Sequence, residues 1–121
     1  MAKVFLDTNI FIDLVEKRSE ISLQDLDEHD VYISPLSLHI LHYVTKQKVP
    51  YKKLLSIIDQ FSLVTITVPL CYMALEGPTN DFEDNVQLHS AEQADCIYFL
   101  THDKQLLTMK FFGKMRIVST L

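Results

Sequence analysis

The chain has 121 residues, 48% of them hydrophobic, a formal net charge of −5 and no apolar run near the roughly 18 residues of a membrane span. This length predicts one domain over residues 1–121 with a core of its own, and the acidic balance argues against nucleic-acid binding driven by bulk positive charge. The start of the chain has no signal-peptide layout, and Cys71 and Cys96 form no disulfide framework, so we expect a cytoplasmic protein without a membrane segment.

The first predicted element is a buried strand over residues 3–6, because apolar residues run there without polar alternation, as in a parallel sheet covered by helices. Asp7 then lies at the carboxyl end of the strand, where open α/β sheets bind ligands. A helix is predicted over residues 9–17. Asp7 therefore has two open interpretations at this point, as the cap of that helix and as part of a chemical site.

The rest of the chain alternates between helical and strand patterns. Ser22 and Asp25 have the spacing of a near capping box, and Pro35 and Pro69 open helices in which proline occupies the first turn. The alternation predicts an α/β domain with a right-handed, mostly parallel sheet between helix layers. The predicted helices are at residues 21–29, 35–46, 50–61, 69–75 and 81–94 with a helical turn at 104–107, and the predicted strands are at residues 31–33, 64–68, 96–100 and 115–118.

Two further carboxylates take informative places. Asp84 lies in the first turn of the helix over residues 81–94, on the same face as its predicted N-cap, Asp81, whereas Glu83 is expected to point elsewhere. Asp103 follows the strand over residues 96–100, just as Asp7 follows the strand over residues 3–6.

Because parallel strands end at one edge of a sheet, Asp7, Asp84 and Asp103 are expected to converge. Three convergent carboxylates repel one another unless they are protonated or neutralised, and oxygen ligands suit Mg²⁺ or Mn²⁺. The residues therefore predict a site for one of these ions.

These acidic segments resemble a known family. The sequences LDTN at residues 6–9, DFED at residues 81–84 and THD at residues 101–103 are similar to the three acidic motifs of the PIN domain. This family consists of small metal-dependent ribonucleases and includes the VapC-type toxins of toxin–antitoxin pairs. The resemblance covers essentially the whole chain and implies a single Rossmann-like, three-layer α/β/α domain with a mostly parallel sheet.

The resemblance also implies the roles of individual residues. Asp7, Asp84 and Asp103 would be catalytic residues that hold one or two Mg²⁺ or Mn²⁺ ions, and RNA would be cut by metal-activated water. The supporting residues would be Asn9 and Thr101 as polar groups and Asp81 as an auxiliary carboxylate.

The sequence departs from the family pattern at one place. The pattern has a glutamate on the helix after the second strand, in a segment that resembles Ile-Ser-x-x-Ser/Thr-Leu-x-Glu-Leu. Ile40 occupies that position here, and no carboxylate occurs between residues 31 and 58. His39 and His42 are one and two residues out of register, so we expect the usual glutamate ligand to be lost.

Two functions follow as expectations. The first is metal-dependent hydrolysis of RNA phosphodiester bonds by an endoribonuclease toxin, weakened by the missing glutamate. The alternative is a catalytically degenerate PIN-fold module that binds an antitoxin or RNA. The resemblance implies RNA, a small antitoxin and a second copy of the chain, in a homodimer, as partners.

Two surface questions stay open in the sequence. The apolar residues between 35 and 75 either face the core or form a dimer surface. The basic residues between 46 and 53 are either a solvated edge or a rim that contacts phosphate. The residues concerned are Leu38, Leu41, Leu54, Leu55, Ile58 and Phe61 in the first group, and Lys46, Lys48, Lys52 and Lys53 in the second.

Overall fold

A strand of four residues, β1 (Lys3–Leu6), lies at the centre of the fold and pairs in parallel with a neighbour on each side. The computed structural model describes residues 2–18 and 21–121. It contains a six-stranded sheet in the order β3-β2-β1-β4-β6-β5, parallel except for the β5–β6 pair. The other strands are β2 (Asp30–Ile33), β3 (Ser62–Leu63), β4 (Tyr98–Leu100), β5 (Phe111–Phe112) and β6 (Met115–Val118).

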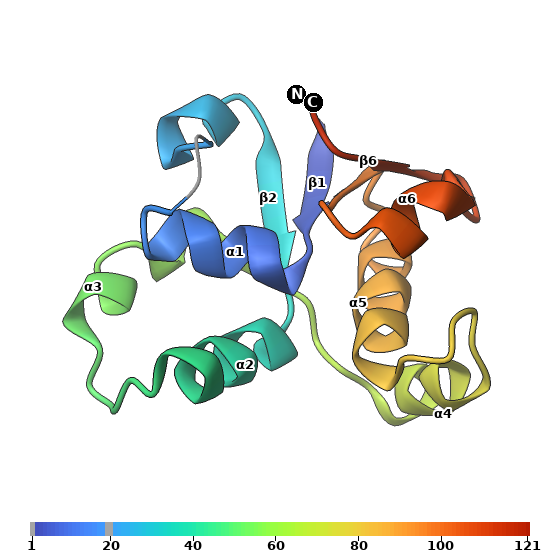
Figure 1. The fold of residues 1–121 in the computed structure, drawn as a ribbon, viewed down its shortest axis with the longest axis horizontal. Coiled ribbons are helices and arrows are strands. Elements are labelled where there is room, and N and C mark those ends of the chain that lie inside the picture. Colours follow the sequence, from blue (N-terminus) through green and yellow to red (C-terminus); the bar gives the residue numbers. More distant parts are fainter. Residues whose placement is uncertain (1, 19–20) are drawn as a thin grey trace.

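Helices cover both faces of this sheet. In Figure 1, α1, α2 and α3 lie to the left of β1, and α4, α5 and α6 lie to its right. The helices are α1 (Thr8–Val15), α2 (Pro35–Thr45), α3 (Lys52–Leu55), α4 (Val68–Glu76), α5 (Phe82–Gln93) and α6 (Lys104–Met109), with 3₁₀ helices at Leu23–Leu26 and Ile58–Gln60.

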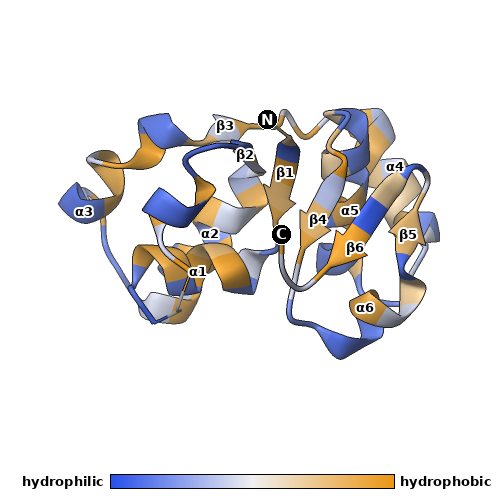
Figure 2. Cartoon of the chain, turned by 90° about the horizontal axis from the view of Figure 1, so that it is seen from above, coloured by the Kyte–Doolittle hydropathy of each residue, from blue (hydrophilic) through white to orange (hydrophobic). Residues whose placement is uncertain are grey.

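Alternate residues of the central strand pack into two separate cores. Val4 and Leu6 belong to the hydrophobic cluster that includes α1, α2 and α3, whereas Phe5 belongs to the cluster that includes α5 and α6. A third, smaller cluster joins α4 to α5, so α4 packs on α5. Figure 2 shows β1 and β4 between the two groups of helices, with hydrophobic residues along most of both strands. The predicted three-layer α/β/α arrangement with a mostly parallel sheet is therefore confirmed.

Several predicted elements differ in extent. The predicted strand over residues 64–68 is wrong, because β3 contains only two residues and precedes that segment. The backbone N–H of Val64 still donates to the carbonyl of Ile33, 2.9 Å away, but β2 ends at Ile33. The following residues therefore have no strand to pair with, and the side chain of Thr67 instead caps α4 by accepting from the N–H of Leu70.

The predicted helices at residues 21–29 and 50–61 are shorter in the structure. The first is a 3₁₀ helix, and its predicted capping box between Ser22 and Asp25 is present. The second is split into α3 and the 3₁₀ helix at Ile58–Gln60. Where α3 ends, the Ser56 hydroxyl donates to the carbonyl of Lys53 at 2.7 Å. The hairpin of β5 and β6 was not predicted. Gly113, with φ of 61°, supplies the left-handed residue that its tight turn requires.

Of the six apolar residues singled out between 35 and 75, five face the core. Leu41, Leu54 and Phe61 are buried, and Leu38 and Ile58 are half-buried against the same cluster. The side chain of Leu55 is instead 61% exposed. No helix within residues 2–18 and 21–121 has the length and apolar character needed to cross a membrane.

Ile40 is a half-buried hydrophobic residue that packs against the cluster of α1, α2 and α3. We predict that Ile40→Glu lowers the free energy of unfolding by about 1–3 kcal/mol, because it moves a carboxylate into apolar surroundings. Urea denaturation in EDTA measures this loss. Val44→Glu, on the same helix at a residue that is 54% exposed, is the control and should change stability little. Full recovery of the Ile40→Glu variant by Mn²⁺ would instead mean that residue 40 reaches a metal site.

Candidate functional site

Asp7 is the first residue after β1, and its carboxylate is buried where α1 begins. The residue is 6% exposed. Its Oδ1 accepts from the backbone N–H of Thr8 at 2.8 Å, and its Oδ2 accepts from the Thr101 hydroxyl at 2.6 Å. Burial raises the pKa of Asp7, while the hydrogen bonds from Thr101 and Thr8 lower it. Asp7 therefore both caps α1 and presents a carboxylate at the carboxyl edge of the sheet.

Thr101 connects Asp7 to Asp103. Thr101 is fully buried just after β4, and its hydroxyl oxygen accepts from the backbone N–H of Asp103 at 3.0 Å. The Asp103 carboxylate is the N-cap of α6 and accepts from the backbone N–H of Leu106 at 3.1 Å. Since β1 and β4 pair in parallel, the two aspartates follow neighbouring strand ends at one edge of the sheet.

The first turn of α5 brings a second acidic group to this edge. Asp81 is the N-cap of α5, as predicted, and accepts from the backbone N–H of Asp84 at 2.9 Å. The buried Asn85 fixes the preceding loop, because its side-chain amide donates to the carbonyls of Ala74 and Thr79 at 2.8 and 2.9 Å. The position at which α5 begins is therefore tied to the end of α4.

The carboxylates act on one another electrostatically. Burial, and then the negative charges of four neighbouring carboxylates, raise the pKa of Asp84 to about 7. Asp103 also contributes to raising the pKa of Asp7, so Asp7, Asp84 and Asp103 lie within reach of each other's charge. The four groups that raise the pKa of Asp84 are, in order, Asp81, Asp7, Asp103 and Glu83.

Glu83 belongs to this acidic group, although the helical pattern predicted that it points elsewhere. Burial first, and then the charges of Asp81 and Asp7, raise the pKa of Glu83, while a hydrogen bond from the Thr8 side chain lowers it. The helical pattern considered α5 alone, whereas in the fold the charge of Asp7, at the start of α1, also acts on Glu83.

A buried polar cluster behind Glu83 was also missed. Gln87 is fully buried and binds the side chains of Ser34, Ser37 and Thr8 at 2.5, 2.8 and 2.6 Å. The cluster links α5 to α1 and α2. The available signal was the position of Gln87 between Val86 and Leu88 on a helix flanked by buried strands.

Other predicted residues lie outside this network. Asn9 is exposed on the second residue of α1. His39 is exposed, and the His42 ring contacts the carbonyl of Leu38 at 2.7 Å and packs edge-on against Tyr51. Neither histidine is directed to the acidic group in place of the missing glutamate.

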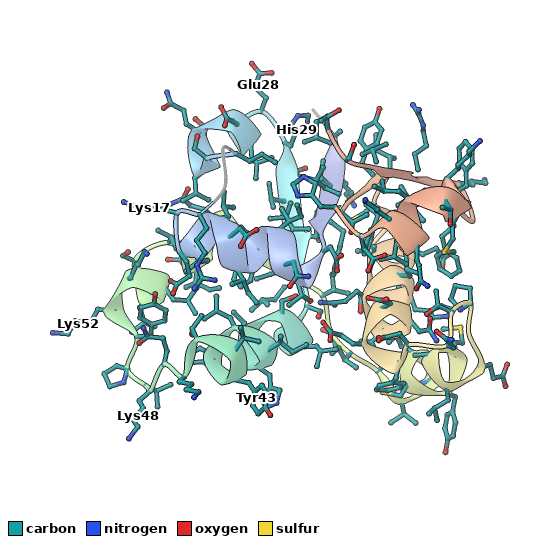
Figure 3. All side chains as sticks on the ribbon, in the orientation of Figure 1. Lys17, Glu28, His29, Tyr43, Lys48 and Lys52 are labelled. Carbon is teal, nitrogen blue, oxygen red and sulfur yellow. The ribbon has the colours of Figure 1, made fainter. Side chains whose placement is uncertain are left out.

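Several lysines lie on the α3 side of the molecule, apart from α5. Figure 3 shows Lys17, Lys48 and Lys52 pointing outward on the α3 side, whereas α5 lies on the other side of the molecule. Lys53 pairs with Glu16 at 3.6 Å. Among the described residues, the charges that shift the pKa values of Asp7, Glu83 and Asp84 are all negative.

A divalent cation fits the chemistry of these donors, because carboxylate oxygens are hard and negatively charged. The coordinating arrangement itself is not formed. In residues 2–18 and 21–121, no group of three or more His, Cys, Asp or Glu side chains is arranged to hold a metal ion. Asp7, Asp81 and Asp103 instead accept hydrogen bonds from backbone amides. The metal site therefore stays a prediction.

The raised pKa of Asp84 predicts a pH dependence in the absence of metal. The folded carboxyl binds its proton more tightly than the unfolded one, so stability falls as pH rises from about 4 through about 7. In EDTA, Asp84→Asn should remove this loss and stabilise the fold at pH 8 by about 1–2 kcal/mol, discounted for solvent around a half-buried group. Urea denaturation at pH 5 and pH 8 measures the difference. Asp59→Asn, at an exposed position, is the control; an equal gain from both variants would contradict the assignment.

Comparisons with known proteins agree with this architecture. The family model described as PIN domain matches residues 4–111. Among solved structures, this chain is similar to one chain in a crystal structure of VapBC2 from Rickettsia felis. In that crystal structure, VapBC2 is bound to a DNA fragment from its promoter. The two chains share 15% sequence identity with a TM-score of 0.70, over 96% of this chain and 97% of that chain. A comparison with curated proteins gives no match. The structural likeness shows the fold, and the family match spans most of the sequence, so the chain belongs to the PIN domain family.

Proposed function

We propose that this PIN domain is an endoribonuclease that hydrolyses RNA phosphodiester bonds with Mg²⁺ or Mn²⁺. PIN domains are in general nucleases that depend on divalent metal ions. The observation that carries the proposal is the hydrogen-bonded link through Thr101, which joins the carboxylate of Asp7 to the backbone of Asp103 at 2.6 and 3.0 Å. This link fixes two of the three candidate ligands relative to each other at the carboxyl edge of the sheet.

Each candidate ligand has a distinct part in the proposal. Asp7, buried and oriented by Thr101, is the anchoring ligand. Asp84 and Asp103 supply the other carboxylates from the first turn of α5 and the start of α6. The bound ion supplies activation of water and neutralisation of phosphate charge. Because the pKa of Asp84 is raised to about 7, this group gives up a proton when it becomes a ligand near neutral pH.

We further propose that the protein is the toxin of a toxin–antitoxin pair, that it acts in the cytoplasm, and that its partners are a small antitoxin and a second copy of the chain. The structural likeness to VapBC2 supports the antitoxin. An apolar stripe on α4 offers a surface for a protein partner. Its residues Val68, Tyr72 and Leu75 are four and three apart and are 68%, 66% and 70% exposed.

A second candidate function is a binding module without catalysis. Two observations favour it. Ile40 stands where the family pattern has a glutamate, and the carboxylates of the described chain do not form a coordinating group. Such a module would retard RNA or an antitoxin in a binding assay without cutting RNA when Mn²⁺ is present.

The nuclease proposal predicts the effect of removing single charges. Asp7→Asn and Asp103→Asn should each reduce Mn²⁺-dependent RNA cleavage by about 100-fold or more, because each removes a ligand oxygen charge from the site. Cleavage of a labelled RNA with Mn²⁺, and with EDTA as the blank, measures this. Asp30→Asn, an exposed aspartate at the opposite end of β2, is the control. Parent-level cleavage by both site variants would show that the chemistry lies elsewhere.

A further inference from the structure

The outer face of α2 carries aromatic and basic residues and no carboxylate. We propose that this face binds single-stranded RNA outside the site of cleavage and leads it to the carboxyl edge of the sheet. In this assignment a base stacks on Tyr43, and Lys46 and Lys48 contact phosphates. The inference rests on the proposed function, because it takes RNA as the ligand and names the surface that binds it.

Charge is distributed unevenly along the chain. Residues 31–58 contain four of the eleven basic residues and none of the sixteen acidic ones, although the net charge of the whole chain is −5. Among residues 2–18 and 21–121, the one ion pair joins Lys53 to Glu16, so the other three lysines of the segment have no carboxylate partner there. All three are exposed. Because salt screens exposed charges over about 10 Å, this segment attracts phosphates even on an acidic protein.

The exposed residues of α2 form a stripe along the helix. Ser37 and Leu41 are fully buried and mark its inner face. The opposite face presents His39, Tyr43 and then Lys46 at the C-cap, four and three residues apart and all exposed. Tyr43 is 77% exposed, and Figure 3 shows its side chain pointing away from the body of the molecule. An aromatic ring exposed to this extent is available for stacking against a base, and lysines beside it add contacts to the backbone of a single strand.

The stripe starts at the candidate site. Asp7 and Ser34 follow the ends of β1 and β2, which are parallel neighbours, so α1 and α2 begin at the same edge of the sheet. The Nε2 group of Gln87 ties the two helix starts together, because it donates to Thr8 at 2.6 Å and to Ser37 at 2.8 Å. From this edge α2 extends over 11 residues, or about 16 Å. An acidic protein segment would also suit the lysines, but a face that begins beside the candidate site favours the substrate.

Fluorescence anisotropy of a short, labelled single-stranded RNA in EDTA measures binding without cleavage. Tyr43→Ala should weaken RNA binding about 5-fold or more, because it removes the stacking ring. Tyr43→Phe keeps the ring and should bind like the parent. Phe111→Ala is the matched control, since it removes a ring that is 55% exposed on β5, at one end of the strand order, and should also bind like the parent. Parent-like binding by Tyr43→Ala would overturn the stacking role.

The salt dependence of the same binding tests the lysines. Replacing both Lys46 and Lys48 by Gln should weaken binding and reduce the slope of log Kd against log salt concentration by about 1.4, because each phosphate contact with a single strand contributes about 0.7. Replacing Lys110 and Lys114 by Gln is the control, because it removes the same charge from exposed positions around β5 and should leave the slope unchanged. Thermal melting in EDTA shows that each variant is folded. An equal loss in both double variants would mean that net charge alone acts and would overturn the assignment.

Cleavage of the same RNA with Mn²⁺ separates failure of this inference from failure of the proposed function. If the parent cuts RNA while the Tyr43 and lysine variants bind RNA as the parent does, the nuclease stands and the RNA-binding face is wrong. Unchanged RNA binding together with loss of a dimer in sedimentation would assign the face to a second copy of the chain instead. If the variants lose RNA binding in EDTA while the parent cuts no RNA, the face stands and the proposed hydrolysis fails. If the parent neither binds nor cuts RNA, both fail.

Discussion

The placement of several carboxylates, all negatively charged, near one edge of the sheet is the constraint on which the rest of this structure depends. Carboxylates that follow β1 and β4 act electrostatically on those at the start of α5, and among the described residues the charges that shift the pKa values of Asp7, Glu83 and Asp84 are all negative. The fold accommodates these negative charges because three helices, α1, α5 and α6, begin beside them. Asp7, Asp81 and Asp103 accept hydrogen bonds from backbone N–H groups at the positive ends of α1, α5 and α6.

The same helix starts engage the carboxylates when no metal is bound. Asp7, Asp81 and Asp103 each accept a hydrogen bond from a backbone amide. Asp84 is different, because it lies inside the first turn of α5 rather than at the cap, and the pKa of its carboxyl is raised to about 7. On the proposed function, a cation at this edge would compete with capping hydrogen bonds and with protons.

The start of α2 holds the buried side chain of Gln87 and carries no carboxylate. Ser34 and Ser37 fix the amide of Gln87, and this amide in turn joins Thr8 to the helix that carries Glu83. Buried networks of this kind are stable when every member finds partners, and they then hold neighbouring groups rigidly. Lys17, Lys48 and Lys52 point outward on the α3 side of the molecule, so these three lysines lie away from α5.

The sequence by itself determined the buried first strand, the alternation of helices and strands and the aspartates that follow β1 and β4, because periodicity and capping are local properties of a few neighbouring residues. The tertiary structure alone decided the short β3 and the hydrogen bonds of the buried Gln87. Each of these depends on contacts between segments far apart in the chain. β3 ends with its partner β2, and Gln87 donates to Thr8 of α1, about which the helical pattern of α5 carries no information.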